Sequence, residues 1–129
     1  MTRMVHFRTG DGEFAIAVES VLEVRRASGL VPMPSPGPDV VGLLPRVKDT
    51  LTVLTLLGSG REHVLVIDAG QAPFGLLVEE VCGILAVDER AVEPAPRGQS
   101  SDLVSGVIRT GEGVVLLVDA HALERRVAA

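Results

Sequence analysis

The sequence contains no tryptophan and no tyrosine, and its only phenylalanines are Phe7, Phe14 and Phe74. Proteins that bind single-stranded nucleic acids commonly stack the bases on exposed aromatic rings. The formal net charge of −5 also gives no excess of cations to pair with a phosphate backbone. We therefore expect no nucleic-acid partner.

Cysteine and long hydrophobic runs are scarce as well. Cys82 is the only cysteine and cannot form a disulfide within the chain, which favours an intracellular protein. No apolar run approaches the roughly 20 residues that a membrane-spanning helix needs. Met1–Thr9 lacks the apolar stretch of a signal peptide. We expect a soluble cytoplasmic domain with no segment inserted in a membrane.

What the sequence does contain is alternation of apolar and polar residues, a period of two that predicts β-strands. The 129 residues suffice for one domain with a buried core, and 47% of them are hydrophobic. Turns such as Gly10–Gly12 and Thr110–Gly113 separate the alternating segments. The predicted strands are Met4–Thr9, Glu13–Val18, Val40–Val47, Thr50–Leu56, His63–Asp68, Phe74–Val81, Gly83–Val87, Leu103–Arg109 and Val114–Asp119.

Strands at this spacing favour a barrel or a sandwich over alternating strands and helices. They suggest two small barrels that share one core, approximately residues 10–60 and 61–119, with strands that could swap between them. Helix is predicted as a turn or so at Glu19–Val24 and over Ala120–Val127, where Asp119 is a candidate N-cap. Ala27–Asp39 and Glu93–Asp102 are expected to be irregular. The predicted fold class is mainly β with a short C-terminal helix.

Candidate catalytic residues are few. Cys82 has no histidine near it in the sequence, so we expect a buried structural cysteine. Asp119 and His121 could supply two metal ligands, but no third or fourth is apparent. Gly58–Gly60 lacks the lysine and the length of a phosphate-binding loop. We expect no enzyme activity, no metal site and no cofactor.

Several short motifs recur in order along the chain and together resemble the CheW family of chemotaxis coupling proteins. The resemblance extends from about Val5 to about Leu123. The motifs are Phe7, Gly10-Asp11, Phe14-Ala15-Ile16, Val21-x-Glu23-Val24, the proline cluster Pro32–Pro38, Gly42, Leu56-Leu57-Gly58, Phe74–Val81 and Gly106.

This resemblance implies two intertwined five-stranded, SH3-like barrels with a hydrophobic groove between them. It also implies a non-enzymatic adaptor that joins the cytoplasmic tips of chemoreceptors to the regulatory domain of the histidine kinase CheA. Two other functions stay open. One is a barrel protein that binds a small molecule in the same cleft, and the other is a divergent adaptor of a pathway other than swimming chemotaxis.

The resemblance further implies which residues contact each partner, and each implied receptor-binding residue has a structural alternative. The apolar ones could belong to the core, Glu23 could simply be solvated, and barrel curvature alone could require the two glycines. The implied receptor-binding residues are Val21, Glu23, Gly42, Gly75, Val81 and Ile84. The implied kinase-binding residues are Val92, Glu93, Pro94 and Pro96.

One segment departs from the family pattern. The family usually carries Asn-Leu-Arg-Gly just after the position of Gly42, and its arginine takes part in receptor contact. Here the segment is Pro45-Arg46-Val47-Lys48, so Val47 stands at the position of the arginine. Arg46 would point to the opposite face of a strand, and Pro45 predicts an edge or an interruption of that strand. We therefore predict altered contact with the usual receptor.

Overall fold

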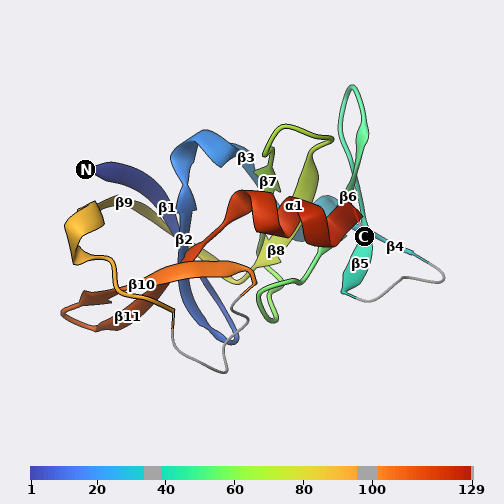
Figure 1. Ribbon diagram of the computed structural model, residues 1–129. Helices are drawn as coiled ribbons and strands as arrows, with labels where there is room; N and C mark the ends of the chain where they lie inside the picture. Colours follow the sequence, from blue (N-terminus) through green and yellow to red (C-terminus); the bar gives the residue numbers. More distant parts are fainter. Residues whose placement is uncertain (34–38, 96–101, 129) are drawn as a thin grey trace.

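The structure is a computed structural model that describes residues 1–33, 39–95 and 102–128. Two β-sheets, called sheet A and sheet B, lie side by side, and the helix α1 (Ala120–Ala128) lies in front of them in Figure 1. Asp119 caps this helix, because its Oδ1 accepts hydrogen bonds from the backbone N–H groups of His121 and Ala122. The mainly β fold with a short C-terminal helix is confirmed.

Sheet A has five strands in the order β10-β11-β2-β1-β9. It unites the two ends of the chain, because β11 pairs in parallel with β2 and places Leu117 opposite Ala15. The strands are β1 (Thr2–Thr9), β2 (Gly12–Ala17), β9 (Glu80–Val87), β10 (Val104–Thr110) and β11 (Gly113–Val118).

Sheet B has six strands in the order β3-β7-β8-β6-β5-β4 and comes from the middle of the chain. Its sixth strand, β4, has only two residues and lies in the segment that was expected to be irregular. The strands are β3 (Val21–Arg26), β4 (Val31–Pro32), β5 (Val40–Pro45), β6 (Thr50–Leu54), β7 (His63–Ile67) and β8 (Phe74–Val78).

Sheet membership differs from the predicted division near residue 60. The β1–β2 hairpin joins the C-terminal strands in sheet A, while both β6 and β7 lie in sheet B. The difference arises from the pairing of β11 with β2 and of β1 with β9, which join segments far apart in the sequence. Hairpin spacing carries no information about such non-local pairing.

Two predicted elements are wrong. The predicted helical turn at Glu19–Val24 is a short 3₁₀ turn, η1 (Val18–Ser20), followed by strand β3. Val21 and Val24 of β3 pair with Ile67 and Leu65 of β7. The apolar segment is too short for its spacing to distinguish helix from strand, so the pairing with β7 determines that it is a strand. The predicted strand Phe74–Val81 ends at Val78, and β9 begins after Glu79.

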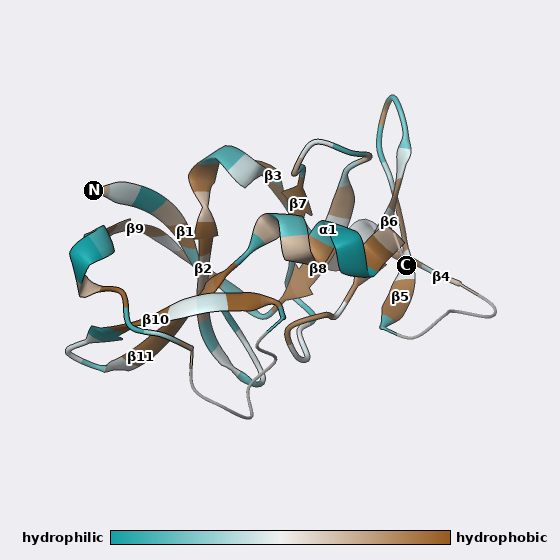
Figure 2. Ribbon diagram, in the orientation of Figure 1, coloured by the Kyte–Doolittle hydropathy of each residue, from teal (hydrophilic) through white to brown (hydrophobic). Residues whose placement is uncertain are grey.

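The core comprises three hydrophobic clusters, and apolar residues follow the central strands in Figure 2. The central cluster joins both sheets to α1 and includes Phe7 of β1, Leu65 of β7 and Leu123 of α1. A second cluster lies in sheet A around Ala15, and a third lies in sheet B around Val64. Alternate residues of β1 and β7 therefore enter different clusters, and the central cluster holds the two sheets together.

Gly75→Ala should lower the free energy of unfolding by about 1–3 kcal/mol, because it overpacks the third cluster. A Cβ at this buried position would lie 2.7 Å from Val64 Cγ1 and 2.9 Å from Val53 Cγ2. Urea denaturation measures the effect. Gly111→Ala is the matched control, since a Cβ at Gly111 meets no atom within 4 Å. Equal stability of the two variants would contradict a packing role for Gly75.

Candidate functional site

Two chain crossings connect the sheets, and each leads directly into an edge strand. The first crossing is η1, after which β3 starts at Val21 on one edge of sheet B. The second is Glu79, after which β9 forms an edge of sheet A and carries Val81 and Ile84. The crossings thus place three of the implied receptor-binding residues on two edge strands, each of which follows a crossing between the sheets.

Two of these three side chains, Val21 and Val81, pack on the central cluster. Val21 is opposite Ile67, Val81 is opposite Phe7, and each is half-buried against that cluster. Ile84 is opposite Val5, a member of the same cluster, yet 52% of its surface is exposed. Val21 and Val81 therefore border the central cluster, and we call these two residues, together with the exposed Ile84, the apolar margin. Ile84 is its most accessible member.

Val81 and Ile84 lie within strand β9 rather than in a hinge before it. A bulge separates them, because His6 pairs with Gly83 and the next residue, Phe7, pairs with Val81. Cys82 is left without a partner in this bulge and is exposed, so the expectation of a buried cysteine is wrong. Partial desolvation and the nearby carboxylates of Glu80 and Glu13 raise the pKa of its thiol. A raised pKa disfavours the thiolate that nucleophilic chemistry needs.

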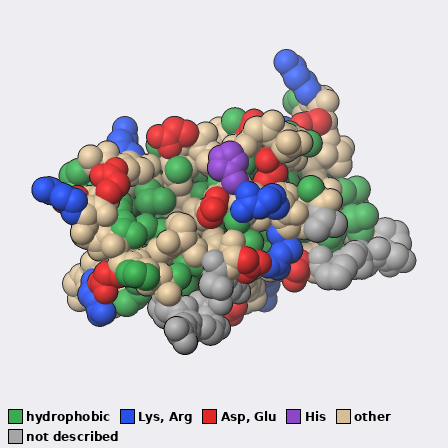
Figure 3. Space-filling model, viewed as in Figure 1, with side chains coloured by type: hydrophobic (Ala, Val, Ile, Leu, Met, Phe, Trp, Pro, Cys, Tyr) green, Lys and Arg blue, Asp and Glu red, His purple; other side chains and the backbone are tan. Residues whose placement is uncertain are grey.

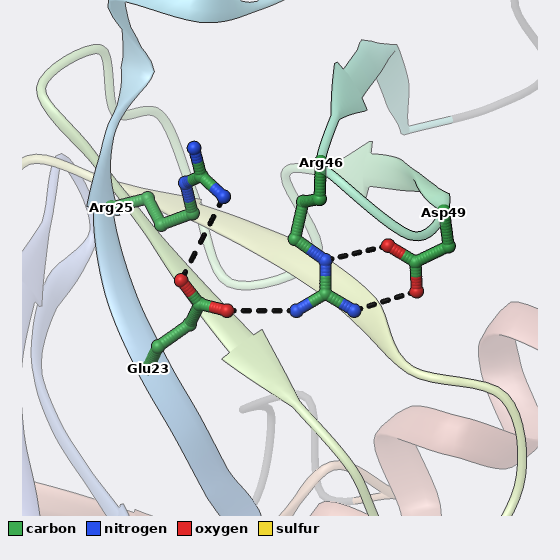
Figure 4. Close-up of polar contacts among 4 residues, drawn as sticks. All are labelled: Glu23, Arg25, Arg46 and Asp49. Carbon is green, nitrogen blue, oxygen red and sulfur yellow. Dashed lines mark hydrogen bonds and ion pairs between the residues drawn. The ribbon is translucent and has the colours of Figure 1, made fainter.

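Glu23 belongs to a charged cluster between β3 and the loop of the β5–β6 hairpin, which also contains Arg25, Arg46 and Asp49 (Figure 4). Arg46 donates to Asp49 through Nε at 2.7 Å and through Nη2 at 2.6 Å. Its Nη1 donates to Glu23 Oε2 at 2.8 Å, and Arg25 Nη1 lies 3.8 Å from Glu23 Oε1. One guanidinium therefore joins the β5–β6 hairpin to the opposite edge strand, β3. Glu23 is held in place by this pairing.

The charged cluster engages all three guanidinium nitrogens of Arg46. The Arg46 side chain is only 16% exposed, and the paired carboxylates, first Asp49, raise its pKa. The hydrogen bonds from Arg46 in turn lower the pKa of the Asp49 carboxyl. Between them, Val47 is fully exposed at the tip of the hairpin, which projects from the body of the molecule in Figure 1. Val47, which the resemblance aligns with the family's arginine, is therefore a solvated side chain.

The sequence did not identify Arg46, Asp49 and Arg25 as members of a common site. Arg46 and Asp49 stand three residues apart around a tight turn, closed by a backbone hydrogen bond from Arg46 N to Asp49 O. That spacing is a local signal for their pairing. Glu23 is 23 residues from Arg46, so only the curvature of sheet B brings them together.

Gly42 and Gly75 do not belong to the apolar margin, and both are buried. A Cβ on Gly42 would collide with the carbonyl oxygen of Val31 on the neighbouring strand β4. A Cβ on Gly75 would enter the third cluster, as described above. Close packing inside sheet B accounts for both glycines, so any effect on binding would act through the shape of the barrel.

The implied kinase-binding residues lie on sheet A, apart from Pro96, which is outside the described residues. Glu93 forms an isolated bridge with Val107 of β10, through two backbone hydrogen bonds of 2.8 and 2.9 Å. Val92 packs on the sheet A cluster, and Pro94 is exposed. This segment therefore extends the β10 edge of sheet A and presents Pro94 to solvent.

The structure offers little that resembles a catalytic or metal centre. Across residues 1–33, 39–95 and 102–128, no three His, Cys, Asp or Glu side chains lie together as a metal site requires. An open recess of about 330 Å³ lies beside the charged cluster, and it is lined by Glu23, Arg25 and residues 46–49. In the part of the chain that the structure describes, no helix is long and apolar enough to cross a membrane. On the face seen in Figure 3, basic and acidic side chains are interspersed.

A family model described as CheW-like domain matches residues 3–127. The "Probable chemotaxis protein CheW" of Rhizobium etli is 28% identical over 133 aligned residues, which cover 93% of this chain and 85% of that protein. The "Chemotaxis protein CheW" of Treponema pallidum is 20% identical, with coverage of 94% and 81%.

The fold is similar to that of the scaffolding protein TtCheW from Thermoanaerobacter tengcongensis. The TM-score is 0.80 at 18% identity, and the match covers 92% of this chain and 84% of that chain. At this identity the likeness shows a common fold. The pair of sheets seen here is thus a fold already found in a protein with a scaffolding role.

Proposed function

Because the chain belongs to the CheW-like domain family, we propose that it is a coupling adaptor of a chemotaxis signalling array. The observation that carries the proposal is the family match over residues 3–127, nearly the whole chain. The relatives that bear chemotaxis names support it over a similar span. The adaptor would act in the cytoplasm and work by binding, without catalysis.

The first proposed partner is the helical hairpin at the cytoplasmic tip of a chemoreceptor. The apolar margin at Val21, Val81 and Ile84 supports this assignment, because an amphipathic helix binds by laying its apolar face against such a surface. Glu23 lies on β3, the strand that carries Val21, and adds a charged border. Gly42 and Gly75 would contribute through the packing of sheet B.

The second proposed partner is the regulatory domain of the histidine kinase CheA. The segment at Val92, Glu93 and Pro94 is the proposed contact, with Pro96 beside it in the sequence. The exposed Pro94 and the bridge of Glu93 to β10 give this segment a defined surface on sheet A. Receptor and kinase would then bind separate parts of the molecule, as a coupling function requires.

A small-molecule-binding barrel has less support. Ligand pockets are usually enclosed and mainly apolar, whereas the recess beside Arg46 is open and lined largely by charged side chains. An adaptor for a pathway other than swimming chemotaxis would use the same surfaces, and neighbouring genes would distinguish it.

We expect the purified chain to bind a soluble CheA regulatory domain from its own organism in a calorimetric titration. A receptor tip titrated in parallel tests the second contact, and mass spectrometry of the purified chain tests for a retained small molecule. Lack of binding to both the kinase domain and every receptor tip of that organism would contradict the coupling function.

A further inference from the structure

The β1–β2 turn is fastened to the loop that connects β6 with β7. The backbone N–H of Gly10 donates to the carbonyl oxygen of Ser59 at 2.8 Å. The hydroxyl of Thr9 donates to the carbonyl oxygen of Leu57 at 2.7 Å and accepts a hydrogen bond from the backbone N–H of Asp11 at 3.1 Å. These contacts, which we call the sheet clamp, join the β1–β2 turn of sheet A to the β6–β7 loop of sheet B near the second covalent crossing, Glu79.

Thr9 is the central residue of the sheet clamp. It is only 5% exposed, and its hydroxyl is satisfied both as donor and as acceptor. Gly58 packs directly against it, since a Cβ there would lie 2.8 Å from Thr9 Oγ1 and 2.7 Å from Asp11 Cγ. Close packing leaves the turn and the loop little freedom to slide past each other.

The clamp is continuous with the start of β9. Arg8, the neighbour of Thr9, accepts a hydrogen bond from the backbone N–H of Glu79 at 2.9 Å. It also pairs with Glu80, and the next pair along the strands joins Phe7 to Val81. The β6–β7 loop also packs closely on the end of β8, because a Cβ on Gly60 would lie 2.6 Å from Val78 Cα. The position of β9 relative to sheet B therefore depends on the clamp.

We infer that Thr9 is a positioning residue, which sets the spacing between edge strands β3 and β9 and thereby the affinity for a receptor tip. This inference rests on the proposed function. The sheets are joined covalently at two crossings, one directly before β3 and one directly before β9. Non-covalent contacts must therefore restrict the rotation of one sheet relative to the other. Loss of the Thr9 hydroxyl leaves the buried carbonyl of Leu57 without this donor and allows the turn to separate from the loop.

Thr9→Val and Thr9→Ser form a matched pair, since the first keeps the volume and the second keeps the hydroxyl. The spacing can be measured with spin labels on Cys82 of β9 and on Leu22→Cys of β3, both of which are exposed positions. The measurement is made well below the melting temperature, where each variant is folded. We expect Thr9→Val to broaden or shift the distribution of distances between the two labels, and Thr9→Ser to preserve it. An unchanged distribution in Thr9→Val would overturn the inference.

Binding is measured on the unlabelled proteins. If Thr9→Val reduces the population with competent spacing to about one fifth, the receptor tip should bind about fivefold more weakly. Kinase binding should be unchanged, because the proposed kinase segment lies within sheet A. Should Thr9→Val fail to fold, Thr9→Ala replaces it. The receptor tip is one from the chain's own organism that the wild-type chain binds. Equal receptor affinity of folded Thr9→Val and Thr9→Ser would overturn the inference, whereas lack of wild-type binding to both the kinase domain and every receptor tip of that organism would overturn the proposed function.

Discussion

Ile84→Asp should weaken binding of a receptor tip by more than about 1 kcal/mol and leave the melting temperature nearly unchanged. The variant places an unpaired carboxylate where the receptor helix is proposed to bury an apolar side chain, and desolvation of that charge opposes binding. Because 52% of Ile84 is already exposed, the folded protein loses little packing. Calorimetric titration and thermal melting of the same preparation give the two values.

Val114→Asp is the matched control for Ile84→Asp. Val114 is 44% exposed on β11, three strands from β9 in sheet A, so it adds the same charge away from the proposed site. Val81→Asp is less selective, since Val81 packs on the central cluster and its loss should also lower stability. A receptor affinity of Ile84→Asp equal to that of Val114→Asp would exclude the apolar margin from the receptor contact.

The predicted strands correspond to observed ones because they are short apolar-rich runs bounded by turn residues, a signal that persists in β7 and β8 although these strands are buried along nearly their whole length. The helical turn predicted at Glu19–Val24 failed because Val21 and Val24 also satisfy the pattern of a strand, and pairing with β7 decides between them. The strand predicted over Phe74–Val81 divides at Glu79, where the two adjacent acids Glu79 and Glu80 interrupt the alternation. The consequence of this division, a crossing from sheet B to sheet A, depends on pairing with β1 and has no local signal.

The candidate site was predictable to a smaller extent. The family resemblance directs attention to Val21, Val81 and Ile84, which the structure places on edge strands, and the first two pack on the central cluster. The sheet clamp escaped notice because Thr9 and Leu57 are 48 residues apart. The pairing of Arg46 with Glu23 and Asp49 was not predicted, because Arg46 was assigned to a strand, whereas it lies in the loop between β5 and β6. Long-range polar contacts of this kind depend on the curvature of the sheets.

Replacement of residues 45–48 in the β5–β6 hairpin should strengthen binding of a conventional receptor tip, and its effect on receptor affinity should exceed that of the other variants. The replacement consists of Pro45→Asn, Arg46→Leu, Val47→Arg and Lys48→Gly, and it restores the usual family pattern. We expect the native chain to bind a conventional receptor tip weakly or undetectably, because Val47 offers no donor and the Arg46 guanidinium is already engaged by Asp49 and Glu23. A restored charged hydrogen bond contributes roughly 1.5–3 kcal/mol, which is about one to two decades in affinity.

Parallel titrations of the native and replaced chains against the receptor tip and the CheA regulatory domain test this expectation. Kinase affinity should stay within a small factor, because the proposed kinase segment is on sheet A and the hairpin is on sheet B. The single change Val47→Arg separates the arginine at the tip from the loss of the Arg46 pairings, since it keeps Arg46 bound to Glu23. If the native chain already binds the conventional tip as tightly as the replaced chain, the hairpin is neutral for receptor choice and Val47 marks no change of partner.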